Sequence, residues 1–312
     1  MTVVLLQLLL PLALLAGIGR FPPDGKAGFW IQGIATAITL FAIALAGLWV
    51  ALPWWLSNIY PIALGVCAVL GGQRSPWRPG IRGLAGWTHA VAFVALGAFS
   101  ASVLTGALAG RLAPEGEAVD LEFPLANGTY LVANGGSHLV VNSNLRLADP
   151  KEPRRARFRG AAYGVDLVAL DGLGLTAQGF APADPKAHHV YGREVKAPCG
   201  GEVVHAEDGH ADRPVGEPDR DSYAGNHVIL RCGRVDVVLA HLATGSVVAS
   251  RGDKVAAGAT VGRVGNSGAS DAPHLHVHAQ RPGSALSAMS GDPVPMRFGG
   301  RFLVRNDRVG GD

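Results

Sequence analysis

The chain has 312 residues, enough for two domains, and a formal net charge of +3 at pH 7. The charges are unevenly distributed, because residues 1–110 carry five of the 27 basic and one of the 24 acidic side chains, which leaves 22 basic and 23 acidic side chains in residues 111–312. This near-neutral second part gives no electrostatic basis for binding nucleic acid, and we expect none as a partner.

The first part of the chain is strongly apolar. About 20 apolar residues cross ~30 Å of hydrocarbon, so each long apolar stretch is predicted to form a transmembrane helix in a lipid bilayer. Tryptophans lie near the ends of several stretches, as is typical of membrane interfaces. The predicted membrane region covers residues 1–110, with spans at about 3–19, 29–52, 54–72 and 87–110.

The short loops predict the orientation of these spans. Arg20 and Lys26 follow the first span and three arginines follow the third, whereas the loop after the second span has no charge. Basic loops remain in the cytoplasm, so both the N-terminus and the C-terminal part are expected outside. The alternative, a cleaved signal peptide at residues 1–20, leaves three spans and the same orientation.

We therefore expect a multi-pass protein of the cytoplasmic membrane. A linker at residues 111–120 would lead to an extracytoplasmic domain at residues 121–312, on the periplasmic or cell-wall side. No sequence feature identifies a protein partner for the spans.

Residues 121–312 contain short runs of Val, Leu, Ile and Tyr separated by Gly, Asn, Asp and Pro. Such runs predict strands joined by tight turns, and hence an all-β, predominantly antiparallel domain. The predicted strands lie at residues 129–133, 138–142, 164–170, 201–205, 226–230, 235–241 and 274–278.

Cys199 and Cys232 both lie in the predicted outer domain, each beside a glycine at a strand end. In an oxidising compartment this pair can form a disulfide, worth roughly 3–4 kcal/mol for a loop of this length. Two free thiols are the alternative. Cys67 lies in the third span and is expected to fill space as a small apolar residue.

The strongest local signal is the segment Pro273-His274-Leu275-His276-Val277-His278. Alternate residues of a strand share one face, so the three histidines are expected to point the same way. Imidazole is a preferred ligand of zinc and can also transfer protons near neutral pH. The spacing favours a metal site over a solvated row of histidines.

Several motifs occur in an order that resembles the lysostaphin-type (LytM-like) peptidoglycan metallo-endopeptidases. The resemblance covers about residues 160–280. The motifs are Tyr163-Gly164-Val165-Asp166, Ala197-Pro198-Cys199-Gly200, Gly225-Asn226-His227-Val228, Leu239-Ala240-His241-Leu242, Gly252-Asp253-Lys254-Val255, Gly262-Arg263-Val264-Gly265 and Pro273-His274-Leu275-His276.

The resemblance implies a Zn²⁺ cofactor, with Asp166 and His276 as metal ligands and His241 and His274 as the catalytic pair. It further implies a membrane-anchored endopeptidase that hydrolyses peptide cross-links of bacterial peptidoglycan, using zinc-activated water and two assisting histidines. Peptidoglycan peptides would then be its substrate and partner.

One position departs from the family pattern, in which a histidine ligand precedes the aspartate by four residues. Here that position is Ala162, and two protein ligands are one fewer than catalytic zinc normally has. An alternative function is therefore a catalytically degenerate module that binds cell wall or regulates another hydrolase. Possible third ligands are His138, His227 and His278, together with His188 and His189.

Overall fold

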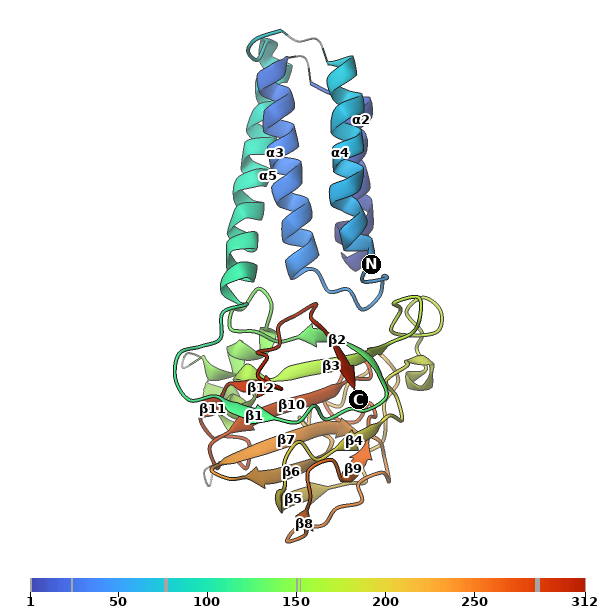
Figure 1. Cartoon of the computed structure of the whole chain (residues 1–312), viewed down its shortest axis with the longest axis vertical. Helices are drawn as coiled ribbons and strands as arrows, with labels where there is room; N and C mark the ends of the chain where they lie inside the picture. The colour runs from blue at the N-terminus through green and yellow to red at the C-terminus, as the bar shows by residue number, and fades with distance from the viewer. Residues whose placement is uncertain are drawn as a thin grey trace. The chain divides into compact units, whose positions relative to one another are not determined.

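The structure is a computed structural model that describes residues 2–23, 25–75, 78–149, 151, 153–283 and 287–311. It divides into two compact units, Met1–Leu108 and Ala109–Asp312. Figure 1 shows the helices of the first unit and the strands of the second.

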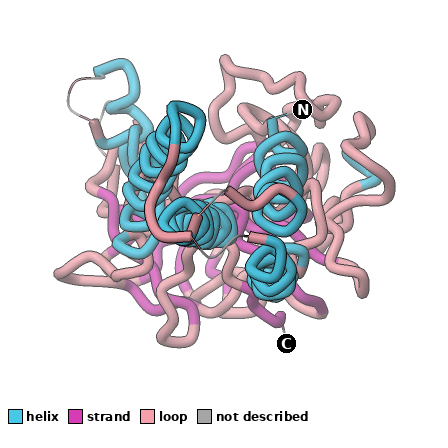
Figure 2. The backbone as a smooth tube through the Cα atoms, turned by 90° about the horizontal axis from the view of Figure 1, so that it is seen from above, coloured by secondary structure: helices cyan, strands magenta, loops and turns pink. Residues whose placement is uncertain are grey.

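The N-terminal unit is helical, and four of its helices are long and apolar enough to cross a membrane, as predicted. Figure 2 views these helices roughly end-on. They are a first helix built from α1 (Thr2–Val4), a π-helical turn (Leu5–Leu9) and α2 (Leu10–Arg20), followed by α3 (Lys26–Ala46), α4 (Leu56–Arg74) and α5 (Gly83–Ala109).

Small and polar residues let these helices pack closely. A Cβ atom at Gly71 of α4 would lie 2.0 Å from the carbonyl oxygen of Ile18 in α2, so this contact requires glycine. The hydroxyls of Thr39 in α3 and Ser100 in α5 lie 2.9 Å apart and share a hydrogen bond. The helix α3 ends at Ala46, six residues before the predicted end of the second span at residue 52.

The C-terminal unit confirms the predicted fold class, an all-β and mainly antiparallel domain. Its large sheet has nine strands in the order β13-β2-β3-β10-β7-β6-β5-β8, with β11 also paired to β10. These strands are β2 (Gly128–Asn134), β3 (Val165–Leu170), β5 (Gly201–Glu207), β6 (Asn226–Cys232), β7 (Val235–Leu242), β8 (Lys254–Val255), β10 (Leu275–Gln280), β11 (Pro293–Val294) and β13 (Arg308–Gly311).

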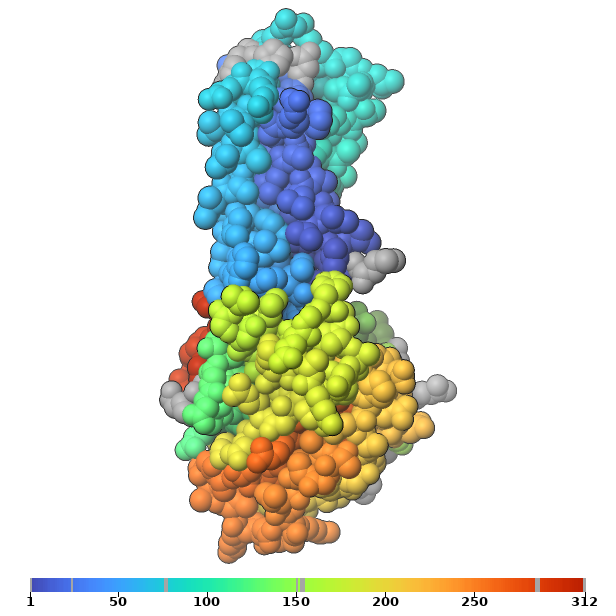
Figure 3. Space-filling view, turned by 90° about the vertical axis from the view of Figure 1, so that its right-hand side faces the viewer, coloured from blue at the N-terminus to red at the C-terminus, as the bar shows by residue number. Residues whose placement is uncertain are grey.

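Two small two-stranded sheets complete the unit. The first pairs β1 (Val119–Leu121) in parallel with β12 (Met296–Phe298), so Val119 and Asp120, expected in the linker, belong to a strand. The second pairs β4 (Glu194–Lys196) with β9 (Thr260–Arg263). In the space-filling view, the yellow-green segment between β3 and β4 forms a continuous part of this unit's surface (Figure 3).

The two faces of the large sheet differ in chemistry. Alternate residues such as Leu167, Leu239 and Val277 lie in the main hydrophobic core, and this side is called the core face. The opposite residues include Asp166, Ala240 and His276, which pair across β3, β10 and β7, and this side is called the site face. The period of two along each strand produces the separation.

One segment differs from the strand prediction. Residues 138–142, predicted as a strand, form a turn in which the His138 carbonyl accepts hydrogen bonds from the amides of Val141 and Asn142 at 3.0 and 2.9 Å. The buried Asn142 side chain fixes this turn by donating to the Gly136 carbonyl at 2.8 Å. Farther along the chain, a 3₁₀ helix spans Pro153–Tyr163.

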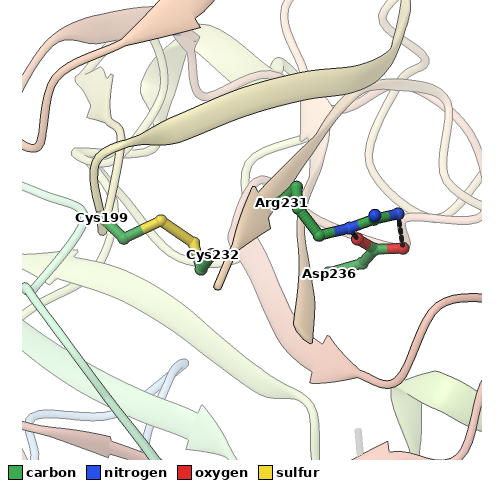
Figure 4. Close-up of a disulfide and its surroundings, with 4 residues drawn as sticks. All are labelled: Cys199, Arg231, Cys232 and Asp236. Atoms are coloured by element: carbon green, nitrogen blue, oxygen red, sulfur yellow. Dashed lines mark hydrogen bonds and ion pairs between the residues drawn. A yellow bond between two sulfur atoms is a disulfide. The ribbon is translucent and has the colours of Figure 1, made fainter. Parts of the chain in front are cut away.

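Cys199 and Cys232 are joined by a disulfide (Figure 4). Cys232 ends β6, and Cys199 lies two residues before β5 begins at Gly201, so the bond fastens one end of the β5–β6 pair. Beside it, the Arg231 guanidinium forms a two-pronged ion pair with the Asp236 carboxylate, which is largely buried.

Candidate metal and catalytic site

The site is built on the pairing of β3 with β10. This pairing places Asp166 directly opposite His276, although 110 residues separate them in sequence. The His276 Nδ1–H donates to Asp166 Oδ1 at 2.7 Å. On its other side His276 faces Ala240 of β7, a residue too small to cover the site face.

His274 and His241 complete the group of four residues singled out in the sequence. His274 Nε2 lies 3.8 Å from Asp166 Oδ1. The ring centroid of His241 lies 4.8 Å from that of His274 and 5.9 Å from that of His276. The four side chains therefore occupy one location on the site face.

A bulge turns His241 toward this location. Regular alternation would place it on the core face with Leu239, but the register shift between β6 and β7 puts Leu242 in the core instead. His241 itself has a φ of 63°, in the left-handed region that non-glycine residues seldom adopt. Such strain is common at functional sites, where the surrounding structure enforces it.

Backbone carbonyls fix the orientation of two of the rings. His241 Nδ1–H donates to the Ser267 carbonyl at 2.9 Å, and His274 Nδ1–H donates to the Ala272 carbonyl at 2.8 Å. In the neutral tautomer, each ring then presents an unprotonated Nε2, which can bind a metal or accept a proton.

The protonation states of the site residues at neutral pH favour binding of a cation. Burial would raise the pKa of Asp166, but His274 and His276 outweigh it and lower this pKa to about 2. Burial lowers the pKa of His241 well below its usual range, and the neighbouring histidines lower it further. At neutral pH, the site therefore holds one carboxylate and a neutral His241.

His278 contacts the site residue His276. It is fully buried, and its ring nitrogen Nδ1 lies 3.0 Å from His276 Nε2. His276 thus has one nitrogen toward Asp166 and the other toward His278. A partner on the second nitrogen commonly orients a metal-binding histidine.

The donor set fits zinc despite Ala162. Asp166, His274 and His276 offer three ligand atoms within 4.8 Å of one another, the number that catalytic zinc usually receives from protein. Ala162 itself is 1% exposed, and its methyl group supplies no donor. Among the described residues, His274 is the side chain that brings this group to three.

The other histidines considered as ligands lie elsewhere. His138 is exposed, and its Nδ1 accepts from the Val140 amide at 3.2 Å. His227 belongs to a separate group with His205 and Glu207. His189 lies 3.7 Å from the Asp171 carboxylate.

Two further residues near Asp166 were missed from the sequence. Tyr223 stacks on Phe158 at 4.2 Å, and burial together with the charge of Asp166 raises the pKa of its hydroxyl. Arg305 donates to the carbonyls of Ala133 and Val140 at 3.1 and 3.0 Å. Both residues lie outside the family motifs, and their positions in the sequence do not indicate that they are close to Asp166.

Comparison with known proteins connects the C-terminal unit with peptidases. Residues 186–288 match Peptidase family M23, a span that includes His241, His274 and His276 but begins after Asp166. No curated protein matches the chain.

Three solved structures are similar to part of this chain, with low TM-scores. The catalytic domain of the prophage-encoded M23 protein EnpA from Enterococcus faecalis, as an A109H mutant, is 23% identical over 38% of this chain and 68% of its own, with a TM-score of 0.26. Lysostaphin from Staphylococcus simulans is 24% identical over 40% of each chain, with a TM-score of 0.25. A putative peptidase M23 from Pseudomonas aeruginosa is 17% identical over 59% of this chain and 57% of its own, with a TM-score of 0.28. The chain therefore spans less than two thirds of the length of lysostaphin and of the Pseudomonas aeruginosa protein.

Proposed function

Because residues 186–288 match Peptidase family M23, we propose that this membrane protein is a zinc endopeptidase that hydrolyses peptide cross-links of bacterial peptidoglycan. M23 peptidases depend on zinc and act on such cross-links. The observation that carries the proposal is the convergence of Asp166, His241, His274 and His276 on the site face.

Asp166 and His276 would hold the metal, and His274 Nε2 would complete the set in place of a side chain at Ala162. Bound zinc would supply Lewis acidity toward the peptide carbonyl and would lower the pKa of water. His278 would hold the His276 ring in the orientation that directs Nδ1 to the site.

His241 is suited to accept a proton from the attacking water. Its Nδ1–H is held by the Ser267 carbonyl, so Nε2 is the basic nitrogen. Its low pKa keeps this nitrogen unprotonated at neutral pH. Once protonated, the same nitrogen can donate the proton to the leaving amine, as a general acid.

The roles of His274 can be separated by experiment. A His274→Ala variant that loses hydrolysis and one zinc ion per chain relative to wild type supports its role as third ligand. A variant that keeps the wild-type zinc content but loses hydrolysis returns His274 to the catalytic pair with His241, as the resemblance implied.

The membrane topology agrees with this substrate. Four candidate membrane helices precede the domain, and the basic loops after the first and third favour the cytoplasm. We propose that the domain lies outside the cytoplasmic membrane, where peptidoglycan is located.

The alternative is a degenerate module that binds cell wall or regulates another hydrolase, and Ala162 favours it. The test is zinc content and release of soluble fragments from a peptidoglycan preparation, for the full chain in detergent. Hydrolysis by the zinc-loaded wild type, together with loss of hydrolysis and of one zinc ion per chain in His276→Ala, supports the enzyme. Peptidoglycan binding without hydrolysis in the zinc-loaded wild type supports the module.

A further inference from the structure

A second group of potential metal ligands lies on β5 and β6, away from the site described above. His205, Glu207 and His227 each offer one ligand atom, and these atoms lie within 4.8 Å of one another. Glu207 pairs directly with His227 across the two strands, and the His205 and His227 ring centroids are 5.1 Å apart.

A bulge in β5 creates this group. Val203 lies in the main core, and regular alternation would bury His205 and Glu207 on the same side. The register shift between Val203 and His205 instead sends Ala206 toward the core and turns His205 and Glu207 to the site face. Their side chains, each 43% exposed, thus meet His227.

The ligand atoms are oriented by neighbours. His227 is 5% exposed, and its Nδ1–H donates to the Gly225 carbonyl at 2.7 Å, which leaves Nε2 as an unprotonated donor. Glu207 has one oxygen 2.6 Å from His210 Nε2 and the other 3.5 Å from His205 Nε2. Metal-binding side chains are commonly oriented in this way, with a backbone carbonyl hydrogen-bonded to the second nitrogen of the histidine and a further group hydrogen-bonded to the carboxylate.

The group opens into a pocket of about 370 Å³ whose wall includes all three ligands. Phe158, Tyr223 and Met289 also line the pocket. An ion bound here would therefore be accessible from solvent and could keep a position open for water or another ligand.

The group is separate from the first site. The strands β10 and β6 are second neighbours, with β7 between them, so their backbones lie about 10 Å apart. Two-metal centres have their ions about 3.5–4 Å apart. The strand order thus favours an independent site over a shared two-metal centre.

We propose that His205, Glu207 and His227 bind a second divalent transition metal ion of the zinc class. Two imidazoles and one carboxylate are the donor types that zinc accepts, whereas calcium and magnesium prefer oxygen ligands alone. The site would hold its ion with three protein ligands and leave a further position toward the pocket.

The experiment is a zinc count on the full chain in detergent, purified with a tag that lacks histidine, stripped with a chelator and reloaded with Zn²⁺ alone. We expect a fall of one zinc ion per chain in His205→Gln and in His227→Gln. In an Asp166→Asn/His276→Ala background, which removes the first site, one ion is expected to remain. Adding His205→Gln to that background should remove it.

His189→Gln is the matched control, since His189 is a partly buried histidine outside both groups. Unchanged zinc content in His205→Gln, or an equal loss in the control, would overturn the proposal. So would an Asp166→Asn/His276→Ala protein that binds no zinc. Circular dichroism of each variant checks that it is folded. If the buried-site variant His227→Gln does not fold, His205→Gln still tests the proposal, because His205 is partly exposed.

Discussion

His276 Nδ1 lies 2.7 Å from Asp166 Oδ1, across two neighbouring strands that are 110 residues apart in sequence. Both atoms are potential metal ligands, and His274 and His241 surround them. The candidate metal ligands and the candidate proton acceptor therefore lie together, and substitutions can test metal binding and proton transfer separately.

Replacement of His241 should separate metal binding from catalysis. Its ring is not in the three-ligand group, so His241→Ala is expected to retain one zinc ion at that site. Loss of a general base typically reduces the rate by about 10²–10⁴-fold. Zinc content and the rate of peptidoglycan hydrolysis, measured on the same preparation, check this. A variant with wild-type rate would exclude His241 as the base.

His278→Gln should weaken the first site without removing a ligand. The His278 ring lies 3.0 Å from His276 Nε2, and loss of such a supporting contact typically costs about 10–100-fold in metal affinity or activity. Zinc competition with a chromophoric chelator measures the effect. If the zinc affinity is unchanged while the His276→Ala protein loses one zinc ion per chain, His278 has a packing role alone.

Ala162→His should restore the family's ligand pattern. The new imidazole would add a donor four residues before Asp166, so zinc affinity is expected to rise. Ala162 is 1% exposed, and overpacking of a closed site typically costs about 1–3 kcal/mol. The metal-free variant is therefore expected to unfold at a lower temperature than wild type. Ala161→His, at a neighbouring buried position, is the control and should show the cost without the gain in affinity.

Loss of the disulfide should destabilise the domain. The bond between Cys199 and Cys232 closes a loop with a sequence separation of 33, for which chain entropy gives roughly 3–4 kcal/mol. The Cys199→Ser/Cys232→Ser protein is expected to unfold at lower denaturant concentration. Cys67→Ser, which removes the free cysteine of the membrane unit, should leave the transition of the C-terminal unit unchanged.

Acidification should destabilise the metal-free domain. Burial and neighbouring histidines lower the pKa values of His241 and His278, whereas unfolded histidine titrates near ~6.5. Below that pH the unfolded chain binds more protons, so stability falls as the pH decreases from 7 to 5. Each such proton contributes about 1.4 kcal/mol per pH unit.

Asp166 adds to the same trend at lower pH. Its pKa of about 2 lies below the unfolded value of about 3.9, so its contribution is present above that value and is lost toward pH 2. Calorimetry of the chelator-treated protein in detergent checks both windows. A transition temperature that is constant from pH 7 to 5 would contradict the histidine part, and His278→Gln should show a shallower dependence than wild type.

The sequence predicted the strands around the first site because alternation is visible there. The segment from His274 to His278 alternates polar and apolar residues, and the structure places the histidines opposite the core residues Leu275 and Val277. The connection to Asp166 came from the family resemblance, since no local pattern shows which distant strand pairs with β10. The turn at residues 138–142 was mistaken for a strand because its apolar run hides the side-chain hydrogen bonds of Asn142.

Bulges explain what alternation could not predict. Strict alternation places His241 with Leu239 and His205 with Val203, on the core face. In both strands one extra residue reverses the sides. The second group was missed for this reason, as its members appear to belong to the core until the register of β5 and β6 is known.

The pairing of Asp166 with His276 across β3 and β10 also determines which sequence changes would destroy the site. A one-residue slip between β3 and β10 would exchange the faces of the slipped strand. If β10 slipped, the imidazoles would point into the hydrophobic interior, and Leu275 and Val277 would point toward solvent. A small insertion or deletion within β10 would thus abolish cation binding and folding stability in the same step. Loss of activity that leaves the fold intact would instead proceed by the exchange of individual side chains of the site.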